Sequence, residues 1–129
     1  MKIVIIDYGA GNIQSIKFAI QRLGYEAVLS HDVDEIQAAD KVIFPGVGEA
    51  SSAMEKLRAT GLDKLIPNLK QPVLGICLGM QLMCHSSEEG NTEGLGIFDL
   101  DVVKFSNAVK VPQIGWNQIS DLKSDLFKG

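Results

Sequence analysis

The hydrophobic positions of residues 1–76 alternate between short apolar runs and helical stripes. Residues 3–6 (Ile-Val-Ile-Ile) form a continuous, mostly β-branched run, which is typical of a strand buried on both faces. We therefore expect this strand at the centre of a parallel sheet. Three further strands are predicted at 25–30, at 41–44, where Pro45 ends the run, and at 72–76, the last as another buried strand.

Helical segments separate these predicted strands. Asn12 is placed as an N-cap, and one helical face then carries four apolar residues until Gly24: Ile13, Ile16, Ile20 and Leu23. Further helices are predicted at 33–39, 50–57 and 62–69, with Gly61 between the last two. The alternation predicts an α/β fold with a flavodoxin-like, doubly wound, mainly parallel sheet.

The pattern changes beyond residue 90. Residues 91–96 form a glycine-containing loop, and 100–105 and 116–119 read as strands without long helices between them. We expect a meander or hairpin there. No repeat or linker divides the sequence, so residues 1–129 are treated as one domain.

Composition narrows the classes of function. With 46% hydrophobic and 22% charged residues the chain is expected to fold, and a net charge of −4 disfavours nucleic acid as a partner. No apolar run approaches the roughly 18–20 residues of a membrane span, so we expect a cytoplasmic protein that binds no membrane. Cys77 and Cys84 lie in one predicted helical stretch, which disfavours a disulfide. His31 and His85 add no recognisable metal-ligand spacing, so neither metal nor cofactor is expected.

A cysteine stands between two glycines where a predicted strand becomes a helix. The segment Gly-Ile-Cys-Leu-Gly-Met-Gln at 75–81 has the layout of a nucleophile elbow, with Gly75 and Gly79 relieving crowding around a strained turn at Cys77. Amide dipoles of the following helix would favour the thiolate. The alternative is a small, buried structural cysteine.

Two other turns follow predicted strands. Pro-Gly-Val-Gly at 45–48 can expose consecutive backbone N–H groups to an oxyanion, or can simply be a tight turn. Asp-Tyr-Gly-Ala-Gly-Asn at 7–12 invites a dinucleotide-binding interpretation, but Gln14 holds the place of the third glycine of that fingerprint. A nicotinamide cofactor is therefore not expected.

These motifs together resemble a known family. The order of these motifs is similar to that of the glutaminase subunits of imidazole glycerol phosphate synthase. The motifs are Asp-Tyr-Gly at 7–9, Gly-Asn at 11–12, Pro-Gly-Val-Gly at 45–48, the cysteine elbow at 75–82, Ser-Glu-Glu-Gly at 87–90, Gly-Leu at 94–95 and Val-Pro-Gln-Ile-Gly-Trp-Asn at 111–117. These are class I (triad) glutamine amidotransferases of histidine biosynthesis. The resemblance covers nearly the whole chain.

The resemblance implies a role for each matching residue. Cys77 would attack the side-chain amide of L-glutamine and release ammonia. Val47, Gly48 and Leu78 would form the oxyanion hole, and Gln81 and Glu89 would bind the substrate. The residues that would face the partner, a (β/α)₈-barrel synthase subunit in a heterodimer, are Asn12, Pro112, Gln113, Ile114 and Trp116. The alternative for Trp116 is a core tryptophan that caps the end of the sheet.

The chain departs from the family pattern in two places. Gln113 stands where the family usually has a histidine, which puts that interface contact in question. The family's catalytic His and Glu lie in a downstream Phe-His-Pro-Glu segment that residues 1–129 do not contain. His31 lies in a predicted loop, and His85 lies about 12 Å along a helix from Cys77, so neither replaces the base. The sequence thus looks C-terminally truncated, and inactive by itself.

Three alternatives stay open. The chain could be the glutaminase subunit of another synthase, such as those of pyridoxal phosphate or anthranilate synthesis, although the opening motif and Gly-Trp-Asn argue against this. It could be a catalytically inactive module that binds a barrel partner. It could also be a flavodoxin-like protein with a redox-sensing Cys77, which would be indifferent to glutamine analogues.

Overall fold

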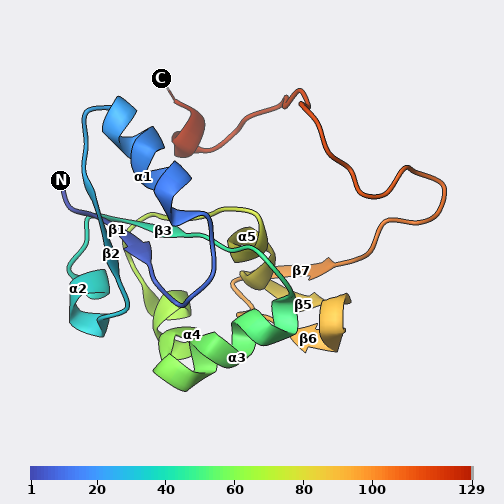
Figure 1. The fold of residues 1–129 in the computed structure, drawn as a ribbon, viewed down its shortest axis with the longest axis horizontal. Coiled ribbons are helices and arrows are strands. Elements are labelled where there is room, and N and C mark those ends of the chain that lie inside the picture. Colours follow the sequence, from blue (N-terminus) through green and yellow to red (C-terminus); the bar gives the residue numbers. More distant parts are fainter. Residues whose placement is uncertain (129) are drawn as a thin grey trace.

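A four-stranded parallel sheet forms the centre of the fold. The computed structural model describes residues 1–128, and its first sheet has the strand order β2-β1-β3-β4. The strands are β1 (Ile3–Ile6), β2 (Ala27–Ser30), β3 (Lys41–Phe44) and β4 (Val73–Gly75). Helices cover both faces (Figure 1), as expected for the doubly wound α/β class.

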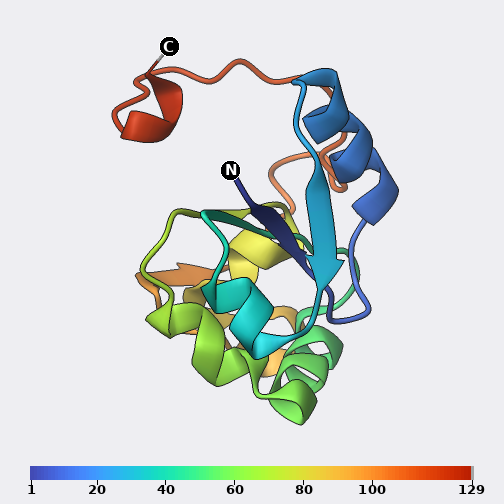
Figure 2. The ribbon, with the colours of Figure 1, turned by 90° about the vertical axis from the view of Figure 1, so that its left-hand side faces the viewer.

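The helices divide unequally between the two faces of the sheet. α1 (Ile13–Arg22) covers one face alone, whereas the other face carries α2 (Val33–Gln37), α3 (Ala50–Thr60), α4 (Leu62–Leu65) and α5 (Leu78–Leu82). Short 3₁₀ turns complete the elements at η1 (Ile66–Asn68), η2 (Glu89–Asn91) and η3 (Asp125–Phe127). In Figure 2 α1 is separated from the layer of α2, α3 and α4 by β1 and β2.

The strand β1 is buried on both faces, as its continuous apolar run predicts. Ile3 and Ile5 pack with Ile20 of α1, while Val4 and Ile6 belong to the larger core formed with the helices of the other face. Since successive side chains of a strand point to opposite faces, a strand between two helical layers needs apolar residues at every position.

Two details of this sheet differ from the prediction. Residues 72–76 were expected to be buried, but β4 lies at the sheet edge and Leu74 is 39% exposed. Leu23 was expected on the buried face of α1, yet the helix ends at Arg22 and Leu23 is 74% exposed. Both side chains lie where the described residues 1–128 provide no covering layer.

A second, three-stranded sheet follows the cysteine elbow. It has the order β6-β5-β7, formed by β5 (Cys84–Ser87), β6 (Thr92–Glu93) and β7 (Phe98–Val102). The prediction that Cys77 and Cys84 share one helical stretch is therefore wrong. α5 ends at Leu82, and Cys84 begins a strand that pairs with β6 and β7. Gly94 permits this pairing, because a Cβ there would lie 2.2 Å from the Cys84 carbonyl oxygen.

The segment after β7 has little regular structure. The strand predicted at 116–119 is absent, and the chain there is extended and exposed, including Trp116 and Ile119. Figure 1 shows this segment, from orange to red, leaving the body and returning to it near η3. The expected meander or hairpin is thus wrong for this part, since no neighbouring strand pairs with it. Within residues 1–128 no helix is both long enough and apolar enough to cross a membrane.

Candidate active site

Three turns meet at the carboxyl ends of the parallel strands. Phe44 of β3 pairs with Gly75 of β4, and the Ile76 N–H donates to the Phe44 carbonyl at 3.0 Å. This register brings residues 45–48 and the cysteine elbow to one edge of the sheet, beside the turn that follows β1. Such an edge, where the strand order reverses, is the usual binding crevice of an open α/β sheet.

Cys77 adopts the strained backbone conformation that its motif predicts. Its φ is 53° and its ψ is −118°, a region that residues with a side chain rarely occupy, and it immediately precedes α5. The residue is exposed and its thiol is free. The flanking glycines are required by space, because a Cβ on Gly75 would lie 2.6 Å from Met83 Sδ, and one on Gly79 would lie 2.0 Å from the Phe44 carbonyl oxygen.

The turn after β3 presents backbone N–H groups beside this cysteine. Gly48 has a φ of 102°, and the N–H groups of Val47 and Gly48 donate to no backbone carbonyl of residues 1–128. Leu78 is the first residue of α5, so its N–H has no acceptor within the helix. The residues predicted to form an oxyanion hole therefore lie in two adjoining turns with unused donors.

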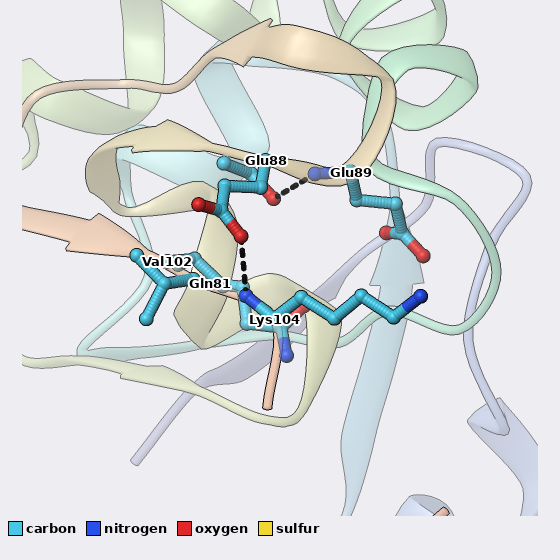
Figure 3. A pocket seen from close by; sticks show the side chains of 7 residues that line it. Gln81, Glu88, Glu89, Val102 and Lys104 are labelled. Atoms are coloured by element: carbon cyan, nitrogen blue, oxygen red, sulfur yellow. Dashed lines mark hydrogen bonds between the residues drawn. The ribbon is translucent and has the colours of Figure 1, made fainter. Parts of the chain in front are cut away.

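A cavity of about 600 Å³ opens between α5, the end of β5 and the end of β7. Gln81 and Glu89, both predicted to bind substrate, line it together, with Glu88 and Lys104. Figure 3 shows the Lys104 side chain running along the cavity toward the side of Glu89. Cys77 is not among the lining residues. It lies one helical turn before Gln81, whose N–H donates to the Cys77 carbonyl at 3.1 Å.

Glu89 has a structural contact as well as a place in the cavity. Its Oε2 accepts from the Ala50 N–H at 2.9 Å, at the start of α3. Glu49 caps the same helix through Ser51 and Ser52, and hydrogen bonds from Ser51, then Ser52, hold the pKa of the Glu49 carboxyl below its usual range. Two carboxylates thus stabilise the positive end of α3, directly after the Pro-Gly-Val-Gly turn.

Neither histidine of the chain lies in this site. His31 is exposed and follows β2, as predicted. His85 lies on β5, not on a helix as expected, and its Nδ1 is 3.3 Å from Asp101 Oδ1. Asp101 also accepts from the Ser86 hydroxyl at 2.6 Å, and these bonds lower the pKa of the Asp101 carboxyl. Residues 1–128 hold no group of three or more His, Cys, Asp or Glu side chains placed to hold a metal ion.

The residues predicted to face a partner lie in two separate places. Asn12 caps α1, its side-chain oxygen accepting from the Ser15 N–H at 3.4 Å, as predicted. Residues 112–116 belong to the exposed segment after β7, in which Ile114 is 84% exposed and Trp116 is fully exposed. Trp116 therefore does not cap the sheet core, which was the alternative interpretation of this tryptophan.

Sequence reasoning missed Lys104 and Tyr8. Lys104 follows β7, and no motif marks it, because only the pairing of β5 with β7 brings it beside Glu88 and Glu89. Tyr8 was seen only as part of the opening motif. Its position two residues after the buried strand β1 was a signal, since side chains there reach the crevice of an α/β sheet.

Comparisons with known proteins identify the family of the chain. Residues 4–129 match the family described as "Glutamine amidotransferase class-I". The "Imidazole glycerol phosphate synthase subunit HisH" of Bacteroides fragilis (strain YCH46) is 60% identical over 132 residues, which cover 100% of this chain and 67% of that protein. The protein of the same name from Yersinia pseudotuberculosis is 48% identical with the same coverage.

A solved structure shares the fold. The chain titled "Crystal structure of glutamine amidotransferase" superposes with a TM-score of 0.68 at 20% identity, covering 84% of this chain and 59% of that one. This chain thus spans about two thirds of its curated relatives and less of the solved structure. Because the family match extends over almost every residue and includes the cysteine elbow, the chain belongs to the class I glutamine amidotransferase family.

Proposed function

We propose that this chain carries the nucleophile, oxyanion site and substrate cavity of a glutaminase subunit. The complete subunit hydrolyses L-glutamine to glutamate and ammonia in the cytoplasm. The ammonia passes to a (β/α)₈-barrel synthase subunit that makes imidazole glycerol phosphate and AICAR in histidine biosynthesis. The observation that carries the proposal is the strained conformation of Cys77 beside a turn with unused N–H donors.

The chemistry follows from these groups. Cys77 Sγ attacks the side-chain amide carbon of glutamine, and the carbonyl oxygen becomes an oxyanion that accepts from the N–H groups of Gly48 and Leu78. The C–N bond then breaks and ammonia leaves, with its extra proton supplied by a general acid. Water attacks the resulting thioester, the C–S bond breaks, and glutamate and the thiol are released. The proton transfers belong to the downstream His and Glu that the family resemblance implies.

The cavity beside Gln81 suits the amino-acid end of glutamine. Glu89 is placed for the α-ammonium group, using the carboxylate oxygen that Ala50 leaves free, and Lys104 is placed for the α-carboxylate. Gln81 lies about 6 Å along α5 from Cys77. The side-chain amide carbon and the α-carbon of glutamine lie about 4 Å apart, so one molecule can reach from Cys77 into the cavity.

The partner surface combines Asn12 with residues 112–116. The segment after β7 exposes Val111, Ile114 and Trp116 together, and a cluster of exposed apolar residues is typical of a protein interface. Gln113 contributes a polar group to the same stretch. The curated relatives are named as subunits, which supports a heterodimer with a synthase subunit.

A second candidate is a module that binds the partner without hydrolysing glutamine. It is favoured by one observation, that neither His31 nor His85 lies beside Cys77 in residues 1–128. The two candidates predict different glutaminase activities for an extended chain. In this extended chain, residues 1–129 are followed by the part of the Bacteroides fragilis relative that lies beyond the matched region.

The experiment measures glutamate release by the extended chain, with the synthase subunit of the same bacterium added. We expect turnover that falls by about 10³-fold or more in Cys77→Ser. The 129-residue chain alone should be about 10²- to 10⁴-fold slower than the extended chain, because a thiol without a positioned base loses general base catalysis. Binding of the partner without any glutaminase activity would favour the second candidate.

A further inference from the structure

The Tyr8 hydroxyl binds the turn that carries the oxyanion donors. Tyr8 is 5% exposed, and its hydroxyl donates to the Pro45 carbonyl oxygen at 2.7 Å. The ring packs against Phe44, with centroids 5.5 Å apart. Tyr8 follows β1 and Pro45 follows the neighbouring strand β3, so this bond joins two turns across the reversal point of the sheet.

The base of the turn is also enclosed on its other sides. A Cβ on Gly46 would lie 2.6 Å from the Tyr8 hydroxyl oxygen and 2.7 Å from the Gly79 nitrogen, and one on Gly11 would lie 2.9 Å from Pro45 Cβ. The turn at residues 7–12 and the first turn of α5 therefore pack closely against residues 45–46. By contrast, nothing lies within 4 Å of a Cβ placed on Gly48. The base of the turn, residues 45–46, is thus closely packed, whereas its other end, residues 47–48, has open space beside Gly48.

Holding residues 45–46 in place affects the orientation of the peptide between Val47 and Gly48. A peptide unit is planar, so holding the Pro45 carbonyl also sets the plane of the following N–H and the direction in which the chain runs to Val47. An oxyanion hole works through donors that are oriented before the reaction begins. A hydroxyl that fixes the base of the turn therefore reduces the number of orientations available to the Val47–Gly48 peptide.

We propose that Tyr8 is a positioning residue for the oxyanion turn, and that its hydroxyl, through Pro45, orients the Val47–Gly48 peptide toward the substrate carbonyl. This inference rests on the proposed glutaminase function. It also gives the opening motif a role inside the active site, separate from the partner contact proposed for Asn12.

The protonation of Tyr8 agrees with a role as donor. Burial, and then the Coulombic effect of the neighbouring Cys77, raise the pKa of Tyr8 to about 12. The hydroxyl therefore keeps its proton throughout the neutral range and remains able to donate to Pro45. The same fact makes Tyr8 unsuited to accept the thiol proton of Cys77.

The test replaces Tyr8 in the extended chain, assayed with the synthase subunit. We expect Tyr8→Phe to lower kcat for glutamine about 5- to 50-fold while KM changes less than twofold, because the lost orientation affects the transition state. Tyr25→Phe is the matched control, since the other tyrosine of the chain is 47% exposed and has no side-chain hydrogen bond within residues 1–128. It should leave both constants unchanged.

A second measurement separates orientation from damage to the fold. Iodoacetamide alkylates a thiolate by displacing iodide from carbon, a reaction that forms no oxyanion. Tyr8→Phe should therefore react with iodoacetamide at Cys77 at the unaltered rate while turnover falls. Replacing Tyr8 with 4-aminophenylalanine, which retains an N–H donor at the same place, should restore kcat.

The outcomes distinguish the inference from the function on which it rests. An unchanged kcat in Tyr8→Phe, with Cys77→Ser inactive, would overturn the positioning role and leave the glutaminase proposal standing. Equal losses of turnover and of alkylation, without rescue by 4-aminophenylalanine, would also overturn it. Full turnover in Cys77→Ser would instead refute the glutaminase proposal itself.

Discussion

Gly79 and the Phe44 carbonyl are in such close contact that a Cβ on the glycine would lie 2.0 Å from the oxygen. This contact lets the first turn of α5 sit directly on the end of β3. It thereby sets Leu78 and Cys77 beside the Pro-Gly-Val-Gly turn. The distance between the proposed nucleophile, Cys77, and the proposed oxyanion donors thus depends on the absence of one methyl group.

Gly79→Ala should therefore damage both stability and catalysis. The added methyl group cannot be accommodated without moving backbone, and we expect a loss of about 3 kcal/mol in the free energy of unfolding. Gly24→Ala is the control, because nothing lies within 4 Å of a Cβ there and only its φ of 82° opposes the change, at about 1 kcal/mol. Denaturant unfolding of both variants measures the difference, and equal losses would contradict the steric argument.

The two cysteines should differ in reaction with a glutamine analogue. A diazo-ketone analogue of glutamine should label Cys77 in the extended chain and leave Cys84 unlabelled, because Cys84 lies on β5 with its Sγ 3.8 Å from the Met80 carbonyl oxygen. Peptide mapping by mass spectrometry identifies the labelled residue, with Cys84→Ser as the matched variant. Labelling of Cys84, or equal labelling of both, would remove the basis of the nucleophile assignment.

Lys104→Ala should weaken glutamine binding without slowing chemistry. Loss of one charge-assisted contact to the α-carboxylate is expected to raise KM about tenfold while kcat stays within twofold. Lys110→Ala, which removes an exposed lysine outside the cavity, is the control. Steady-state kinetics of the extended chain measures both constants. A KM equal to that of the control would exclude Lys104 from substrate binding.

Trp116→Ala should weaken association with the synthase subunit by about 2 kcal/mol. The melting temperature should stay nearly unchanged, because Trp116 is fully exposed and packs on nothing that an alanine would uncover. Leu23→Ala, at a 74% exposed residue at the opposite end of α1 from Asn12, should leave affinity unaltered. Calorimetric titration compares the variants. A large fall in melting temperature with unchanged affinity would speak against the interface.

The contribution of Glu49 to stability should depend on pH. Its folded-state pKa is lowered from the usual 4.5, so its contribution is present above pH 4.5 and is lost as pH falls through the lowered value. Glu49→Gln should thus lower the melting temperature more at pH 7 than at pH 3. Glu55→Gln, on the same helix, is the control. A difference between Glu49→Gln and the wild-type chain that is as large at pH 3 as at pH 7 would contradict the capping role.

The local sequence pattern was sufficient to predict elements whose surroundings are the same along their whole length. The continuous apolar run at 3–6 predicted a central buried strand, and β1 is buried at every position between two helical layers. The Gly-Ile-Cys-Leu-Gly motif predicted the strained turn at Cys77, because the glycines and the change of period are local properties of the chain. The doubly wound class followed from the alternation of such elements.

Tertiary structure decided what depends on pairing between distant segments. Cys84 and His85 were predicted to continue a helix, but residues 84–87 form β5 because β6 and β7 supply its hydrogen bonds. The same pairing brings Lys104 to Gln81 and Glu89, and no periodicity of the sequence contains that relationship. Likewise, the bond between Tyr8 and Pro45 spans 37 positions and exists only because β1 and β3 are neighbours in the sheet. Sequence pattern therefore determined which segments fold, whereas long-range strand pairing decided which side chains meet.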